Sequence, residues 1–331
     1  ESEKELTFDI RTHSAPMAVH ATDALSGIQT YYYYADRVQD TANYKVLTDY
    51  QLLGRSFTEA ADGKFTLDED GSYVVYAYAV DKAGNQSAVI CSNGIVIDNT
   101  APKLTADVPA ESIEANDADV EFTLDEAGTV YYYYCDSNSS LGLNATPSFD
   151  ELVALLGCTA VPVSGEQAGQ LQNIHLSDLD YNTEYAVYLV AEDILKNVGK
   201  VQRLRFKTEK LAPVLKEVPT LTGEYGTKAK DLQPTGGKVC QSDGETILEG
   251  TWSIATANMG LDLVLQAGEE KNYGVIFTVT SAGGLNDTYE DLECDAKVVI
   301  TPRDIASFTV EDIADCEYSG AELTPEPVVK G

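Results

Sequence analysis

Histidine, methionine and tryptophan are scarce in this chain of 331 residues, which holds three, two and one of them. The histidines, at positions 13, 20 and 175, do not have the spacing of metal ligands. No HExxH, GxSxG, Walker A or GxGxxG pattern occurs. A nucleophile would therefore lack a base, so we expect no catalytic residues and no enzymatic activity.

Long apolar runs are also missing. None approaches the roughly 20 residues that a membrane span needs, and no signal peptide is present. The sequence begins at Glu1 and ends at Gly331. We interpret both positions as boundaries of a segment cut from a larger protein.

Basic residues are few relative to acidic ones: 22 against 54, a formal net charge of −32. Such a surface repels phosphate backbones and anionic lipids, so we expect neither nucleic acid nor a membrane as partner. It favours solubility and attracts cations. We expect a monomer.

CxxC pairs are absent, which argues against a zinc ribbon or a thioredoxin-like redox site. The six cysteines lie at positions 91, 135, 158, 240, 294 and 316. Cys135 could pair with Cys158, and Cys240 with Cys294, inside their own domains. The spacing leaves open whether either disulfide forms.

Tyrosine, in contrast, is abundant, with 20 residues, and it marks an internal repeat. Tyr31–Tyr34 and Tyr131–Tyr134 each follow a turn and an apolar stretch, Met17–Ala21 in the first copy and Val120–Leu124 in the second. Each copy therefore predicts a β-hairpin.

A short helix is predicted after each tyrosine run, over Thr48–Gly54 and Ser148–Gly157. Ser148 and Glu151 have the spacing of a capping box, and Gly157 occupies the position expected of a C-cap glycine.

The strongest match between the copies is an alternating strand that begins at Tyr73 and at Tyr185. A leucine precedes each tyrosine by six residues. This spacing predicts a tyrosine corner, in which the hydroxyl bonds the backbone where the chain crosses between sheets. Alternation predicts that one face of each strand is buried.

The rest of the chain differs from the repeat. Short strands are predicted around 236–239, 251–254, 273–280 and 296–301, with turns near 267 and 281. Trp252 is the expected core anchor of this unit. We predict four domains: 1–100, a similar one over 101–212, a different one over 213–303, and the start of a fourth over 304–331.

Several segments resemble modules of large exported bacterial proteins. Ala21–Ile28, Ala79–Ser87 and Ile97–Pro102 look like bacterial immunoglobulin-like repeats. Leu179–Tyr185 and 206–208 resemble fibronectin type III modules. Segments that look like further surface repeats are Gly250–Ser253, Tyr273–Thr278 and Tyr318–Val329. The resemblance implies an all-β fold of tandem immunoglobulin-like β-sandwiches, the first two with a short helical insert.

The same resemblance implies an extracellular, non-catalytic role at a bacterial surface. Such modules act as spacers or as adhesive regions that bind an external protein or glycan. An alternative is an accessory carbohydrate-binding region attached to a secreted hydrolase. The ligand itself is not apparent from the sequence.

Two binding hypotheses involve particular residues. Asp98 and Asn99, at a predicted domain joint near Asp81, could help to hold calcium, which needs six to eight oxygens; the competing interpretation is turn chemistry. No other cofactor is expected.

The second hypothesis concerns the tyrosine runs, whose alternate rings point to opposite faces. Two rings of each run should be core and the other two should line an outer face. The candidate ligand platform is Tyr32, Tyr34, Tyr132 and Tyr134. In the competing interpretation the helical insert covers these rings.

Overall fold

The computed structural model describes residues 6–255, 263–265, 268, 271–280, 284–304, 306, 309–311 and 329–330. Strands in several sheets dominate these residues, and the helices are few and short. The all-β class predicted from the sequence is therefore confirmed. None of the helices described is long and apolar enough to cross a bilayer.

The chain divides into two compact units. The first comprises 1–110, 119–175 and 184–206, and the second comprises 111–118, 176–183 and 207–331. The first unit holds most strands of both repeat copies. The predicted domain boundaries remain predictions.

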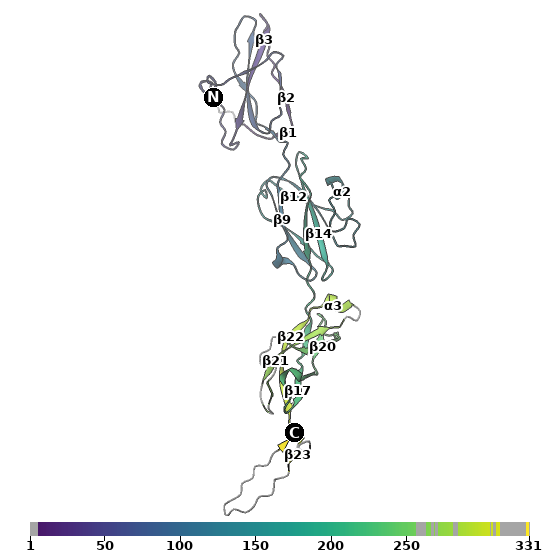
Figure 1. The fold of residues 1–331 in the computed structure, drawn as a ribbon. Helices are drawn as coiled ribbons and strands as arrows, with labels where there is room; N and C mark the ends of the chain where they lie inside the picture. The colour runs from purple at the N-terminus through teal and green to yellow at the C-terminus, as the bar shows by residue number, and fades with distance from the viewer. Residues whose placement is uncertain are drawn as a thin grey trace, which may run out of the picture. The chain divides into compact units, whose positions relative to one another are not determined.

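The first repeat copy is built on one large sheet (Figure 1). Its long central strands, β3 and β6, are antiparallel, and β1 and β8 at one side are parallel. The strand order is β1 (Ile10–Thr12), β8 (Ile95–Ile97), β6 (Gly71–Asp81), β3 (Ile28–Val38) and β4 (Thr58–Ala60), with β7 (Ile90–Cys91) also paired to β6.

A second, two-stranded sheet of β2 (Ala15–Ala18) and β5 (Lys64–Leu67) packs on this one. The ring of Tyr33 on β3 stacks on Phe65 of β5, with centroids 3.6 Å apart. One face of the large sheet is thereby buried against the small one.

The second copy also has two sheets. One contains β13 (Gln172–Leu176), β10 (Ala118–Leu124) and β9 (Leu104–Asp107), and a 3-10 helix covers Ala110–Ser112. The other contains β12 (Thr159–Val163), β11 (Gly128–Cys135), β14 (Glu184–Asp193) and β15 (Gln202–Lys207).

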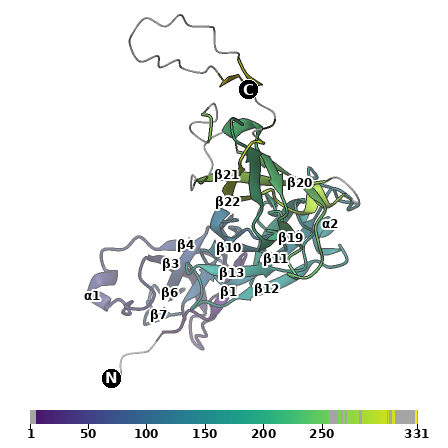
Figure 2. The same ribbon diagram turned by 90° about the horizontal axis from the view of Figure 1, so that it is seen from below.

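Helices α1 (Asp49–Leu52) and α2 (Phe149–Val153) are the predicted inserts. Thr48 and Ser148 are their N-caps, each in a complete capping box. Figure 2 shows α1 on the outside of its group of strands. The prediction for Gly157 was wrong, because α2 ends early with Ala154 as its C-cap, and Gly157 lies in a later turn with φ +96°.

The long strands are buried on both faces, which differs from the predicted one-sided pattern. In β6, Val74 and Tyr76 are buried together with Tyr73 and Val75. In β14 every residue after Glu184 is buried. The reason is that each insert packs on the second face: Leu52 of α1 clusters with Tyr76, and Leu152 of α2 clusters with Tyr188.

The segment after residue 213 forms its own sheets, near the strands predicted for it. A five-stranded sheet runs β18 (Gln233–Thr235), β17 (Thr220–Glu224), β22 (Leu292–Thr301), β21 (Asn272–Val279) and β20 (Gly250–Ile254). The remaining elements are β16 (Val214–Glu217) with β19 (Lys238–Cys240), η2 (Ala229–Asp231), α3 (Leu285–Thr288), and β23 (Thr309–Val310) with β24 (Val329–Lys330).

Five described cysteines, at 91, 135, 158, 240 and 294, are free thiols, so neither disulfide considered above is present. Cys135 and Cys158 nevertheless pack in one apolar cluster. Cys316, most of the predicted turns near 267 and 281, and nearly all of the predicted fourth domain lie outside the described residues.

Candidate functional site

The turn after each long strand has the same geometry in both copies. Asp81 Oδ1 accepts from the Asn85 amide at 2.8 Å, and Asp193 Oδ1 accepts from the Asn197 amide at 2.8 Å. The two asparagine side chains donate back to the same aspartates at 2.9 and 2.8 Å. These hydrogen bonds account for the Asp…Asn spacing that the sequence repeats.

The two predicted corner tyrosines are equally buried, with 7% of each exposed. The Tyr73 hydroxyl donates to the Glu69 carbonyl at 3.1 Å, the contact expected of a tyrosine corner. Tyr185 packs its ring between Phe206 and Tyr134, at centroid distances of 5.6 and 6.3 Å.

A second pair of tyrosines, three residues further on, fastens the inserts. The Tyr76 hydroxyl accepts from the Leu47 amide at 2.8 Å, next to the α1 N-cap. The Tyr188 hydroxyl donates to the Gly142 carbonyl at 2.7 Å and accepts from the Ala145 amide at 3.0 Å. The repeat pattern in the sequence includes Tyr76 and Tyr188, but sequence analysis assigned a role only to the corner tyrosines, Tyr73 and Tyr185.

The tyrosine runs are half-buried throughout. Strand pairing places Tyr34 opposite Tyr76, and Tyr133 opposite Tyr188. Because Tyr76 and Tyr188 are the equivalent insert-facing residues, Tyr34 corresponds to Tyr133. An alignment of the two tyrosine runs that matches Tyr31 with Tyr131 is therefore shifted by one residue.

The four platform candidates consequently lie on different faces. Tyr34 packs in the cluster under α1, and Tyr32 stacks on Tyr78 at 5.1 Å. In the second copy the insert covers Tyr131 and Tyr133 instead.

Tyr134 lies on the opposite face, toward Tyr185, and Tyr132, two residues earlier on the strand, shares that face. The four rings thus form no common row across the repeat. Their role in ligand binding remains a prediction.

Three carboxylates converge at the end of β14. Asp98, Glu126 and Asp193 each place one oxygen within 4.8 Å of the other two. Asp98 follows β8 of the first copy, and Glu126 lies in the turn between β10 and β11 of the second. Of the predicted calcium candidates, Asp98 belongs to this group of carboxylates and Asp81 does not.

Glu126 is the carboxylate of this cluster whose pKa is raised. Burial raises its pKa to about 7, and the negative charges of Asp98, Asp193 and Asp125 add to the rise, while Arg11 opposes it. Asp193 is only 2% exposed and already accepts three N–H bonds. The arrangement can hold a proton on Glu126 near neutral pH, or supply a few of the oxygens that a hard cation requires.

Next to the carboxylates, His13 joins two turns. Its Nδ1 lies 3.1 Å from the Asp98 carbonyl oxygen, and its Nε2 lies 2.9 Å from that of Leu195. Both atoms face acceptors, so the two contacts are hydrogen bonds together only when both ring nitrogens carry a proton. Asn197 reinforces this connection by donating to the Asp98 carbonyl at 3.2 Å.

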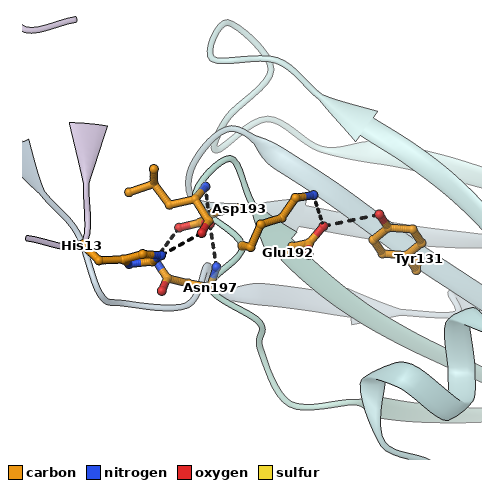
Figure 3. A network of polar contacts seen from close by, with 7 residues as sticks. His13, Tyr131, Glu192, Asp193 and Asn197 are labelled. Carbon is orange, nitrogen blue, oxygen red and sulfur yellow. Dashed lines mark hydrogen bonds and ion pairs between the residues drawn. The ribbon is translucent and has the colours of Figure 1, made fainter. Parts of the chain in front are cut away.

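Figure 3 shows the His13 ring directed at the turn of Asp193 and Asn197, with Glu192 reaching toward Tyr131 on the other side. The Glu192 carboxylate pairs with Lys196 at 2.7 Å and accepts from the Tyr131 hydroxyl at 3.4 Å. The labelled side chains of this network bind partners within the protein. That is typical of a structural joint, and no nucleophile–base pair is visible in it.

Other predicted residues take structural places. Asn99 donates from its backbone and side chain to Asp70 at 2.9 Å, which is turn chemistry. Trp252 is partly buried and packs against both apolar clusters of the segment after residue 213. Its ring is 5.1 Å from that of Phe277.

Comparison with known proteins gives no match: no family model fits the chain, and a search of the curated proteins finds no relative.

Proposed function

We propose that this chain is a non-catalytic segment of an exported bacterial surface protein, in which successive immunoglobulin-like β-sandwiches act as spacer and adhesion modules. The observation that carries the proposal is the repeated unit. Two successive segments share a long strand buried on both faces, an Asp–Asn turn after it, and a capped helix fastened by a strand tyrosine.

Repetition of this kind suits a mechanical role. A unit with its own buried clusters can be added in series without changing its neighbours, so tandem copies set a distance. The net charge of −32 keeps such a segment soluble outside the cell. The inserts distinguish these copies from a plain spacer and offer a surface for adhesion.

Labelling of intact cells of the source organism tests the location. A reagent that cannot cross membranes, followed by recovery of the protein with an antibody, should label it as strongly before lysis as after. Labelling only after lysis would contradict an exported role. The full-length gene product should also carry an export or anchoring signal.

A further inference from the structure

The charge of the chain reverses over one short stretch. Residues 200–210 contain five of the 22 basic residues and a single acidic one. In a protein with 54 acidic residues, such a local excess of positive charge produces a potential opposite to that of the rest. Most of this stretch forms strand β15 (Gln202–Lys207), at the edge of its sheet, and Lys200 lies two residues before the strand begins.

A groove of about 450 Å³ opens where this stretch begins. One wall is the segment 145–149, which leads into helix α2, and the other is 199–201 with Arg203. Tyr188, which fastens the insert, contributes to the lining. The groove is therefore held in shape by the same hydroxyl contacts that fix the insert to the sheet.

Two cationic side chains line this groove, and its described lining holds no acidic side chain to neutralise them. Lys200 and Arg203 are exposed, and none of the described lining residues is acidic. Burial raises the pKa of Tyr188, and the Ala145 amide together with the charge and a hydrogen bond of Arg203 opposes that rise, which places the guanidinium at the Tyr188 hydroxyl. Arg205, two residues on, is instead paired with Glu184 at 2.9 Å.

The other lining groups suit a ring with one polar and one apolar side. Pro147, Phe149 and Val201 supply apolar surface, and Thr146 supplies a hydroxyl. Guanidinium and ammonium groups bind carboxylates through charge-assisted hydrogen bonds. A sugar ring carrying a carboxylate combines these features in a volume that a groove of this size accommodates.

We propose that the groove between the second insert and β15 binds an acidic sugar residue of a glycan, with its carboxylate between Lys200 and Arg203. This inference rests on the adhesive part of the proposed function, because it names the ligand. If no acidic sugar binds, the spacer part of the proposed function is unaffected.

The first copy contains an internal comparison. A groove of about 420 Å³ lies beside the first insert, between α1 with the residues that follow it and residues 86–89. Its lining includes Asp49, and its cation, Arg55, lies over the Tyr34 ring at 5.5 Å from the centroid. Asp49 is the feature that sets this lining apart, because its carboxylate repels an anion, so the second copy should bind the acidic sugar more tightly than the first.

Titration of the purified full chain with an oligosaccharide of glucuronic acid, followed by NMR or calorimetry, tests the proposal. The matched probes are the neutral glucose oligosaccharide and a short oligo-glutamate peptide. We expect the acidic sugar to bind and the neutral sugar and the peptide to bind at least tenfold more weakly. Equal binding of the neutral sugar, preferential binding of the peptide, or no binding of the acidic sugar would overturn the proposal.

Variants localise the site. Lys200→Gln and Arg203→Gln should each weaken binding of the acidic sugar about tenfold, the typical effect of losing one charge-assisted contact. Arg205→Gln removes the same charge outside the groove and should leave affinity unchanged. An equal loss in Arg205→Gln would mean that the cations act only as a charged edge. Lys200→Gln, whose side chain is exposed, separates binding from folding, and a thermal melt checks each variant.

Discussion

At the residue scale, two buried hydroxyl groups hold the inserts in place. Tyr76 and Tyr188 are 1% and 0% exposed. The Tyr76 hydroxyl bonds the Leu47 amide and the Tyr44 hydroxyl, and the Tyr188 hydroxyl bonds two backbone atoms before α2. A buried backbone group without a partner is costly, so these contacts specify where the insert lies.

Replacing Tyr188 by phenylalanine should destabilise the second copy. The Gly142 carbonyl and the Ala145 amide would lose their partner, at a cost of about 1–3 kcal/mol. Hydrogen exchange should accelerate across 142–149, and the melting temperature should fall. Tyr50→Phe, at a ring that is 83% exposed, is the control. Unchanged hydrogen exchange in the Tyr188 variant would contradict the role of the Tyr188 hydroxyl in holding the insert.

Glu126 should make stability depend on pH. Its folded-state pKa of about 7 lies above the ordinary glutamate value of 4.5, so the folded state binds the proton more tightly than the unfolded state does. Its contribution is therefore fully present below pH 4.5 and is lost as the pH rises toward 7. Denaturation between pH 4.5 and 8 should show this loss in the native chain and a flatter profile in Glu126→Gln.

Glu166→Gln, a charge change at an exposed position, should keep the native slope. Identical slopes for Glu126→Gln and the native chain would refute the assignment.

Melts with calcium and with a chelator address the calcium hypothesis from the sequence. A midpoint raised by calcium would support it, and coincident midpoints would count against it.

At the element scale, the helical inserts are too short to be stable alone. Helices of four and five residues gain little from propensity and depend on caps and packing. In α2 the Ser148 hydroxyl donates to Glu151 at 2.9 Å and accepts from its amide at 3.3 Å. Leu152 then anchors the helix in the cluster around Tyr188.

Ser148→Ala should loosen α2 without unfolding the sheets. Loss of the N-cap costs about 1 kcal/mol, and hydrogen exchange should rise over 148–155 and stay unchanged in β14. Ser137→Ala, in an exposed loop, is the matched control. Faster exchange throughout β14 would show instead that the insert and sheet form one cooperative unit.

Sequence reasoning reached these elements because their signals are local. Capping boxes and alternation depend on neighbours along the chain, so Ser148 with Glu151 and the strand from Tyr73 could be predicted. The end of α2 and the correspondence of Tyr34 with Tyr133 could not, because strand register and an early C-cap depend on tertiary packing. The Glu126 cluster was missed for the same reason: its members are far apart in sequence.

At the scale of the whole molecule, we propose that two successive segments are independent copies of one β unit. The shared Asp–Asn turns, and the hydrogen bonds by which Tyr76 and Tyr188 hold the two inserts, support this proposal. Independence means that damage to one copy should leave the other intact, as expected for spacer modules in series.

Force-extension measurement on single molecules of the full chain tests this claim most directly. A unit of about 100 residues lengthens by roughly 300 Å when it unfolds, since an extended residue spans about 3.5 Å. We predict separate steps of this size, with Tyr76→Phe lowering the force of one step and Tyr188→Phe lowering that of another. If both variants weakened the same single step, the segments would unfold together and the account of independent repeated modules would be wrong.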